Sequence, residues 1–377
     1  MNRTRRLRLP VLVTVALGTL AAGCTPSTPT GTTALATPAP TRPGSPAASP
    51  ATPSQPSTPS APVSTPPGEQ PGLAVTVMTY NTLTGRNDCA GCRALKAAGR
   101  GDELALDERM PVVAAKVELA DPDIIGFQEN EGPRPLPQTH LARLLEDYSW
   151  AEPAATVPIA YRSDRFRLVD SGTEVLERER LSCRSGDRTD GRFVSWARLA
   201  VAGTDRQLWV FNTHLHPYDT VACAKLRARN LDRLREVVEA KNPGAAVPQL
   251  VLGDFNAFGD ERRATFRRHR DVMAGLGMDD SRRVADQDVS DVPGAASAHW
   301  MTAPVAGRNR LGVIRRGGRY IDFVWVPKGT DVRSWQVLSG PGVTQRRIAG
   351  ESVPAWSGVM ASDHSPVVVT LVLPAAG

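Results

Sequence analysis

Six apolar segments of this 377-residue chain end in, or are interrupted by, a polar side chain that could take part in chemistry. The segments are VMTYN at Asn81, IIGFQE at Glu129, WVFNTHL at His214, LVLGDFN at Asp254 and Asn256, RYIDFVWV at Asp322, and SDHSPVVV at Asp363 and His364. Carboxylates and amides supply the oxygen ligands that a hard cation such as Mg²⁺ prefers. With two histidines, they suit hydrolysis of a phosphate ester, in which negative charge is neutralised and a water molecule is held in line.

Taken alone, each of these residues also has a purely structural explanation. Asn81 could cap a turn after its strand, and Asp254 with Asn256 could form an Asx turn. His214 could be a structural histidine whose hydrogen bonds are satisfied in the core. Asp322 is harder to explain in this way, because a carboxylate inside an apolar strand usually needs a partner.

Strands and helices must bring these residues together, and short apolar runs alternate with helical patterns along the chain. We expect strands at 73–83, 123–129, 158–162, 166–177, 192–202, 206–214, 249–252, 320–326, 332–338 and 366–373, and helices at 106–119, 137–147, 220–240 and 261–274. This pattern predicts one α/β domain with a large mixed sheet system. Because rigid strands hold side chains at one rim of a sheet, the polar residues should assemble there.

The motifs, in content and in order, resemble those of the endonuclease/exonuclease/phosphatase superfamily, whose fold is that of deoxyribonuclease I. The resemblance spans Leu73 to Leu373 and rests on TYN at 79–81, QE at 128–129, IAYRSDRF at 159–166, NTHL at 212–215, GDFN at 253–256, IDFV at 321–324 and SDHSP at 362–366. It implies a four-layered α/β/β/α sandwich of two mixed β-sheets flanked by helices, formed by residues 73–377. It also implies metal-dependent hydrolysis of phosphoric esters.

The resemblance implies a metal site as well. Glu129 would be the principal ligand of Mg²⁺, with Asn81 beside it and Asp363 as a further contact. Mn²⁺ or Ca²⁺ could take the place of Mg²⁺, and the number of metal ions stays open.

Catalytic roles follow from the same resemblance. His214 would donate to a nonbridging phosphate oxygen, and Asn256 would hold the phosphate or the attacking water. Asp254 would orient or deprotonate that water. His364 would contact the scissile phosphate as an acid or a base, and Asp322 would hold its other nitrogen, since a carboxylate fixes the tautomer of a histidine and raises its basicity. Whether the base is His364 or Asp254 stays open.

Three further residues are candidates for the substrate cleft. Arg162 resembles the family's basic residue near the phosphate, although it could equally be a surface arginine. His216 and Tyr218 follow the NTHL motif and either line the cleft or belong to a loop.

The first 72 residues indicate export. Residues 1–23 combine a basic start with a short apolar run, as in a signal peptide, and the following Cys24 is typical of a bacterial lipoprotein whose cysteine carries the lipid. An ordinary cleaved signal with a chance cysteine is the alternative. Residues 24–72 form a stalk rich in Pro, Ser and Thr, which cannot bury enough apolar surface to fold. We therefore expect a lipid-anchored protein on the extracellular face of the membrane, or a secreted one.

The remaining four cysteines allow three disulfide pairings. We expect Cys89–Cys92, because a close pair in a glycine-containing loop closes easily, and therefore Cys183–Cys223. A zinc site and a thioredoxin-like motif at Cys89 and Cys92 are alternatives.

The net charge of +6 does not by itself indicate a nucleic-acid partner, because four arginines lie in the first eight residues and the rest of the chain carries +2. Two local clusters of arginines are more informative: Arg262, Arg263, Arg267, Arg268 and Arg270, and Arg308, Arg310, Arg315, Arg316 and Arg319. They favour a nuclease, which we expect to be an extracellular monomer, although such arginine runs could also be solvated surface faces. A sphingomyelinase-like phospholipid hydrolase, an inositol- or sugar-phosphate hydrolase, and a binding module on a decayed enzyme fold are the alternatives.

Overall fold

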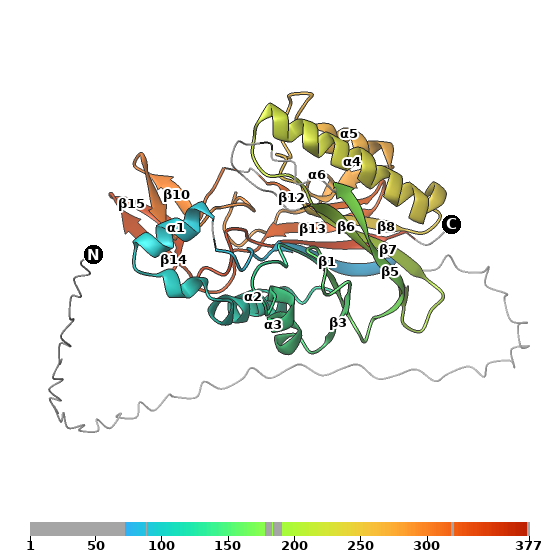
Figure 1. The fold of residues 1–377 in the computed structure, drawn as a ribbon, viewed down its shortest axis with the longest axis horizontal. Helices are drawn as coiled ribbons and strands as arrows, with labels where there is room; N and C mark the ends of the chain where they lie inside the picture. The colour runs from blue at the N-terminus through green and yellow to red at the C-terminus, as the bar shows by residue number, and fades with distance from the viewer. Residues whose placement is uncertain (1–71, 88, 178–182, 184–190, 318–319, 375–377) are drawn as a thin grey trace, which may run out of the picture. The chain divides into compact units, whose positions relative to one another are not determined.

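Two mixed β-sheets, each of six strands, form the centre of the molecule (Figure 1). The computed structural model describes residues 72–87, 89–177, 183, 191–317 and 320–374, which belong to one compact unit. The predicted signal peptide, Cys24, the stalk up to residue 71 and Arg319 lie outside the described residues. Among the helices of the described ranges, none is both long and apolar enough to cross a membrane.

The first sheet has the strand order β13-β16-β1-β2-β4-β3. Its strands are β1 (Leu73–Asn81), β2 (Ile124–Gln128), β3 (Tyr148–Ala151), β4 (Ile159–Arg162), β13 (Asp331–Val337) and β16 (Val367–Leu373). β1 is parallel to β2, with Asn81 opposite Gln128, and antiparallel to β16, with Thr79 opposite Val367. The ends of β1 and β2 and the segment that enters β16 therefore meet at one edge of this sheet.

The second sheet has the order β5-β6-β7-β8-β12-β9. Its strands are β5 (Phe166–Glu177), β6 (Arg192–Val201), β7 (Gln207–His214), β8 (Gln249–Asp254), β9 (Met278–Asp280) and β12 (Asp322–Pro327). Asp254 stands opposite His214 in the parallel pair β7–β8 and opposite Asp322 in the antiparallel pair β8–β12. The register thus places three predicted site residues at one edge.

Helices cover the two outer faces (Figure 1). α2 (Leu106–Ala120) and α3 (Pro137–Leu144) share an apolar cluster with β1 and β2 of the first sheet. α4 (Val221–Lys241) and α5 (Arg268–Gly275) pack on the second sheet. The sheets face each other closely at Gly126, where an added Cβ would lie 2.7 Å from Asn212 Oδ1. The predicted α/β/β/α sandwich is confirmed.

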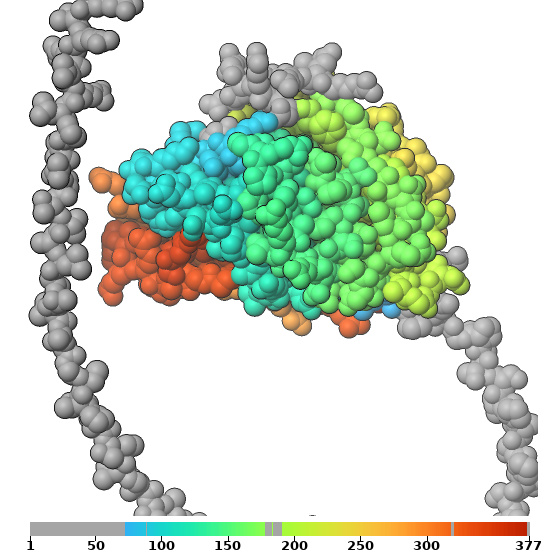
Figure 2. All heavy atoms as spheres, turned by 60° about the horizontal axis from the view of Figure 1, so that its bottom comes forward, coloured from blue at the N-terminus to red at the C-terminus, as the bar shows by residue number. Residues whose placement is uncertain are grey.

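Smaller elements, which no pattern in the sequence predicted, surround the sandwich. They are α1 (Ala90–Ala97), α6 (Ser281–Val284), the 3₁₀-helices η1 (Gly101–Leu104) and η2 (Pro243–Ala245), and the strands β10 (Thr302–Val305), β11 (Arg308–Leu311), β14 (Val343–Ile348) and β15 (Glu351–Trp356). The hairpins β10–β11 and β14–β15 share a small apolar cluster of their own. We call residues 300–317 and 341–357 the hairpin lobe. In Figure 2 the red-orange surface of this part of the chain lies beside the cyan surface that includes α1.

Most predicted elements agree with the structure within a few residues, but the helix expected at 261–274 begins only at Arg268. The carboxylate of Glu261 accepts hydrogen bonds from the backbone N–H groups of Arg262 and Arg263, so the chain turns there. Both expected disulfides, Cys89–Cys92 and Cys183–Cys223, are present.

Candidate active site

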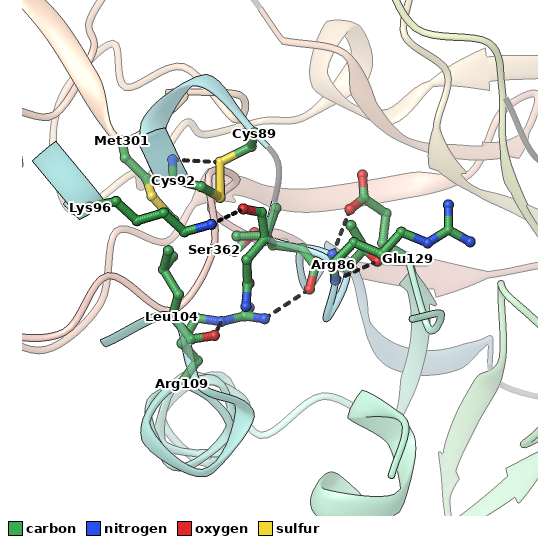
Figure 3. Close-up of a disulfide and its surroundings, with 12 residues drawn as sticks. Arg86, Cys89, Cys92, Lys96, Leu104, Arg109, Glu129, Met301 and Ser362 are labelled. Atoms are coloured by element: carbon green, nitrogen blue, oxygen red, sulfur yellow. Dashed lines mark hydrogen bonds between the residues drawn. A yellow bond between two sulfur atoms is a disulfide. The ribbon is translucent and has the colours of Figure 1, made fainter. Parts of the chain in front are cut away.

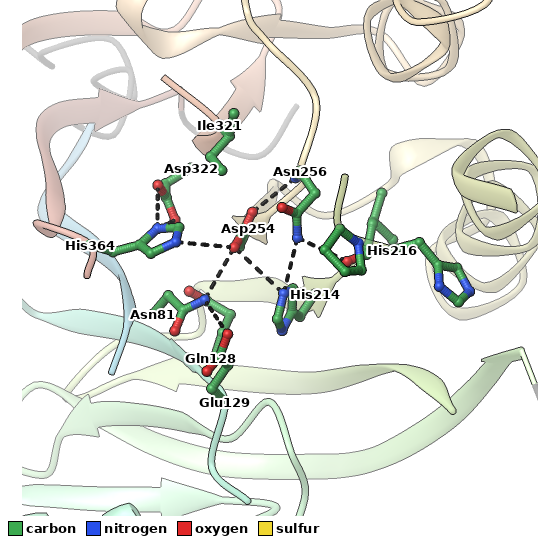
Figure 4. Close-up of polar contacts among 12 residues, drawn as sticks. Asn81, Gln128, Glu129, His214, His216, Asp254, Asn256, Ile321, Asp322 and His364 are labelled. Carbon is green, nitrogen blue, oxygen red and sulfur yellow. Dashed lines mark hydrogen bonds and ion pairs between the residues drawn. The ribbon is translucent and has the colours of Figure 1, made fainter. Parts of the chain in front are cut away.

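Asp254 lies at the centre of a cluster of polar side chains contributed by both sheets (Figure 4). Its Oδ2 accepts a hydrogen bond from Asn81 Nδ2 at 3.1 Å and lies 3.5 Å from His214 Nε2 and 3.7 Å from His364 Nε2. Burial, and then the charge of Asp322, raise the pKa of Asp254 above its ordinary value. A buried carboxylate with a raised pKa, between two histidines, is suited to take a proton from water.

The turn after β8 aims Asn256 at His214. Asp254 Oδ1 accepts a hydrogen bond from the backbone N–H of Asn256 at 2.8 Å. The Asx turn considered from the sequence is therefore present, and it orients the Asn256 side chain. Asn256 is held at a φ of 48°, and its Nδ2 lies 3.1 Å from His214 Nε2. Burial, followed by the charge of Arg192, lowers the pKa of His214 well below its ordinary value. His214 is therefore neutral, and its Nε2 accepts the hydrogen bond from the Asn256 amide.

His364 is held by Asp322 as its sequence context suggested. Its Nδ1 lies 3.0 and 3.1 Å from the two carboxylate oxygens of Asp322, and both side chains are buried. Burial alone would lower the pKa of His364, but the carboxylates of Asp322, Asp254 and Asp363 raise it well above its ordinary value. The imidazole is thus charged, with Nε2 turned toward Asp254.

Glu129, Asn81 and Asp363 come from the first sheet and the segment entering β16. Glu129 Oε1 accepts from Asn81 Nδ2 at 3.0 Å, and Oε2 accepts from the backbone N–H of Thr84 at 2.7 Å. Glu129 itself has a φ of 62°, a left-handed conformation that a side chain adopts at a cost and that often marks functional sites. The amide oxygen of Asn81 accepts from Leu83 N, so both ends of this amide are bound to protein groups.

Asp363 is suited to hold a divalent cation together with Glu129. Its side chain is buried, and Oδ1 has no hydrogen-bond partner within the described chain. Burial raises the pKa of Asp363, and repulsion from Glu129 raises it further. Two carboxylates that repel each other, one with an orphaned oxygen, are the donor set that a hard cation satisfies. Asp254, Asp322 and His364 also lie within 4.8 Å of one another, but both nitrogens of His364 already face carboxylates.

A cleft of about 790 Å³ is lined by six of the predicted site residues, whereas Asn81 and Asp322 lie behind it; the six are Glu129, His214, Asp254, Asn256, Asp363 and His364. Its wall also contains four residues that were not singled out from the sequence as site residues: Arg86, Arg93, Arg192 and the exposed Trp300. Two of the three cleft candidates named from the sequence lie at this site: Tyr218 lines the cleft, and His216 is fully buried beside it. The three arginines come from a loop, from α1 and from the start of β6, so no local sequence pattern links them.

Arg162 does not reach this cleft. It ends β4, which runs antiparallel to β2, so it lies beside the start of β2 and at the opposite end of the sheet from Glu129. There it pairs with Asp121 at 2.7 Å and Asp164 at 3.2 Å, and it lines a separate surface pocket. The IAYRSDRF segment predicted the strand correctly, but antiparallel pairing carries its polar end away from the site.

A buried arginine that the sequence analysis did not find braces the site from behind (Figure 3). The Arg109 guanidinium donates to the carbonyls of Thr82 at 2.7 Å, Leu83 at 3.1 Å and Ala361 at 2.9 Å, and its Nε donates to Leu104. Burial lowers the pKa of Arg109 to about 10, so it remains charged. One side chain thus ties the segment after Asn81 to the segment before Asp363.

Fold and site together define a hydrolase of phosphoric esters. The model of the endonuclease/exonuclease/phosphatase family matches residues 78–364, roughly three quarters of the chain, and this protein belongs to that family. It is an enzyme of the phosphoric ester hydrolase class, many of whose members depend on a divalent metal.

Solved structures share the fold at low sequence identity. A family member from Bacteroides thetaiotaomicron is 20% identical with a TM-score of 0.57, and covers 81% of this chain and 99% of its own. The mannosyl-6-phosphatase of the same organism is 22% identical, with a TM-score of 0.55 and coverage of 79% and 100%. A family protein from Bacteroides vulgatus is 17% identical, with a TM-score of 0.53 and coverage of 80% and 99%. No relative was found among curated proteins.

Proposed function

We propose that this protein is a Mg²⁺-dependent phosphodiesterase that cleaves nucleic acid. The observation that carries the proposal is the cleft, which joins the cluster of acids and histidines to three arginines and two exposed aromatic rings. Arginines bind the phosphate backbone, and aromatic rings stack on bases of any sequence. The complete set of residues from Asn81 to His364 argues against a decayed enzyme that only binds.

In this proposal Glu129 and Asp363 hold the cation. When bound, it would neutralise charge on the phosphate and polarise the phosphorus–oxygen bonds. Asn81 keeps Glu129 and Asp254 in place through its two hydrogen bonds. The oxygen ligands favour a hard cation such as Mg²⁺ over a soft one.

The chain's own side chains move the protons. Asp254 orients the attacking water and takes its proton, because its carboxylate is buried and has a raised pKa. Neutral His214 donates its N–H to a nonbridging oxygen, and Asn256 supports it. Charged His364, fixed by Asp322, stabilises the negative charge that develops on the phosphate and gives its Nε2 proton to the leaving oxygen as the bond to phosphorus breaks.

The hairpin tips disfavour a lipid substrate. A phospholipid hydrolase would be expected to insert an exposed aromatic hairpin into the membrane, but the tips between β10 and β11 and between β14 and β15 are Ala306–Gly307 and Ala349–Gly350. Neither of these two described tips carries an aromatic residue.

The test is an assay of the purified protein on plasmid DNA, RNA, bis-p-nitrophenyl phosphate, sphingomyelin and sugar phosphates, with Mg²⁺ and with EDTA. We expect EDTA-sensitive cleavage of DNA or RNA that weakens as salt rises. Turnover of sphingomyelin or of small phosphate monoesters alone, with nucleic acid left intact, would overturn the nuclease assignment.

We also propose that the enzyme is anchored outside the cell through a lipid on Cys24. The support is the sequence of residues 1–72, in which a signal-like segment, a cysteine and a proline-rich stalk follow one another. A Cys24→Ser variant should lose labelling by a radioactive fatty acid and appear in the medium. Unchanged labelling would contradict the anchor.

A further inference from the structure

The hairpin lobe carries an unbalanced positive charge. Its residues include six arginines but a single acidic residue, Glu351. The arginines are Arg308, Arg310, Arg315, Arg316, Arg346 and Arg347. Among the described residues, no carboxylate lies within ion-pair distance of any of the six.

The other arginine cluster differs in this respect. Arg263 pairs with Glu261 and Asp219, Arg267 with Asp271, and Arg268 with Asp232. Its charge is largely neutralised by neighbours on the same surface. Two clusters that look alike in the sequence are therefore electrostatically different.

Strand register gathers three of the lobe arginines between the two hairpins. Residues directly opposite in an antiparallel pair share a face. Arg308 and Arg310 stand opposite Val305 and Ala303, and Arg346 stands opposite a valine of β15 that belongs to the same apolar cluster. Arg346 also donates to Leu311 O at 3.3 Å. Arg347, the next residue of β14, points to the other face.

The line of arginines continues toward the catalytic cleft. Arg315 donates to Thr302 O at 3.4 Å, and its guanidinium lies 5.0 Å from the centre of the Trp300 ring. Arg315 and Arg316 line a pocket of about 280 Å³ that shares Trp300 with the catalytic cleft. We call Arg308, Arg310, Arg315, Arg316 and Arg346 the arginine seam.

This pocket adjoins the reacting groups. Ala298, in its wall, pairs as an isolated bridge with His364, and Ile321 directly precedes Asp322. Its lining combines apolar side chains, the rings of Phe258 and Trp300, and two guanidinium groups. A flat base with an adjoining phosphate matches that combination, and a base is free to enter a pocket only when it is unpaired.

We propose that the pocket and the arginine seam bind the unpaired nucleic-acid strand on one side of the scissile phosphate. The nucleotide next to the reaction enters the pocket beside Trp300, and the following phosphates lie along the seam over the two hairpins. This inference rests on the proposed nuclease function and adds the place and direction of substrate binding.

The experiment compares the full protein with an Arg308→Gln/Arg346→Gln variant and with a matched control, Arg267→Gln/Arg268→Gln. Each pair removes two charges from exposed or part-exposed arginines, but only the first pair lies in the seam. Activity is measured on a single-stranded oligonucleotide over a range of salt concentrations, and on bis-p-nitrophenyl phosphate. Thermal melts verify that all three proteins fold.

We expect the seam variant to lose about tenfold in kcat/KM on the oligonucleotide at low salt, mostly through KM. The slope of log kcat/KM against log salt should become shallower by about 1.4, at about 0.7 for each lost phosphate contact. The small ester should be hydrolysed as before, and the control should match the wild type on both substrates.

Two results distinguish a failure of the arginine seam from a failure of the proposed nuclease function. If the wild type cleaves the oligonucleotide and the seam and control variants behave alike, the seam is overturned and the nuclease function stands. If the wild type hydrolyses only the small ester, the nuclease function fails and the seam fails with it. A Trp300→Leu variant adds a second check, because it should raise KM for the oligonucleotide severalfold; an unchanged KM would overturn the pocket.

Discussion

We call the cluster of site residues at the ends of the strands the catalytic rim; it consists of Asn81, Glu129, His214, Asp254, Asn256, Asp322, Asp363 and His364. In this rim, strands of two sheets end within hydrogen-bond reach of one another, and nearly every polar atom has a partner in the protein. The hairpin lobe contributes the five arginines of the seam, three from the strands β11 and β14 and two from the segment that follows β11, and no described carboxylate is within ion-pair distance of them. The rim is buried and interlocked, whereas the seam is exposed at Arg308, Arg316 and Arg346 and half-buried at Arg310 and Arg315, and no ion pair within the described chain links its members to one another. Catalysis and substrate binding therefore have different structural requirements in this molecule.

The difference predicts how each region responds to substitution. A group in the rim acts through its neighbours, so its loss removes the function of the whole cluster. A seam arginine contributes to substrate binding by its own charge. The loss of binding free energy caused by each seam substitution should therefore be small, and the losses of separate substitutions should add.

The largest effect is expected at the rim itself. His364→Ala and Asp254→Ala should each lower kcat by about 10³-fold, because a charged acid or the water's base is lost. Asp322→Asn added to His364→Ala should cost little more, since Asp322 acts only through His364. Kinetics on bis-p-nitrophenyl phosphate measure this. Additive losses in the double variant would show that Asp322 and His364 work separately.

A smaller effect is expected at Arg109, which braces the rim without lining the cleft. In Arg109→Lys the charge remains, but an ammonium cannot reach the four carbonyls. We expect a loss of about 3 kcal/mol in the free energy of unfolding and a fall of about tenfold in kcat with little change in KM. Guanidinium ions added to an Arg109→Ala variant should restore part of kcat. A destabilised variant with unaltered kcat would assign Arg109 to stability alone.

At the seam, the effects of single substitutions on the free energy of substrate binding should be nearly additive. Arg308→Gln and Arg346→Gln should each raise KM for a single-stranded oligonucleotide about threefold, and together about tenfold, as independent contacts do. Comparison of the two single variants with the double variant measures the coupling. A double variant no weaker than either single one would show that the seam is interlocked like the rim.

The last difference between the two regions concerns acid stability and leaves activity at neutral pH unchanged, because the sandwich contains buried histidines and the hairpin lobe has none. Burial, then the charge of Arg270, lower the pKa of His269 to about 3. Between the unfolded pKa of about 6.5 and that value only the unfolded chain binds the proton, so stability is lost as pH falls through this window, by ~1.4 kcal/mol per pH unit. In His269→Phe, whose new ring would pack against Phe323 and Trp325, the free energy of unfolding measured by denaturant titration should fall less steeply as pH decreases. An equally steep fall in the variant would assign the acid sensitivity to other groups.

The sequence predicted the rim well because its residues are tied to strands. Each apolar run ends at a polar residue, and strand pairing leaves few ways to arrange those ends; Asp254 opposite both His214 and Asp322 is the result. The position of Arg162 was wrong because the antiparallel turn of β4 cannot be deduced from its own segment. Arg109 escaped notice because a buried arginine in a helix looks like a solvated one until its carbonyl partners are known.

The hairpin lobe was predicted least well. Its strands are four to six residues long, and neither β11 nor β14 contains a buried residue, so these strands show little apolar alternation. The two arginine clusters look alike in the sequence because Asp219 and Asp232, which pair with Arg263 and Arg268 of the first cluster only, come from distant parts of the chain. Which arginines stay unpaired is a property of the folded surface.

The measurement that tests the central claim most directly is hydrolysis of bis-p-nitrophenyl phosphate by the wild type and by Glu129→Gln as Mg²⁺ is titrated. The account predicts saturable activation by Mg²⁺, complete loss with EDTA, and an apparent Mg²⁺ affinity at least about tenfold weaker in the variant, because one of two anionic ligands is lost. Full activity in EDTA, or equal Mg²⁺ affinity in both proteins, would contradict a metal site at Glu129 and Asp363.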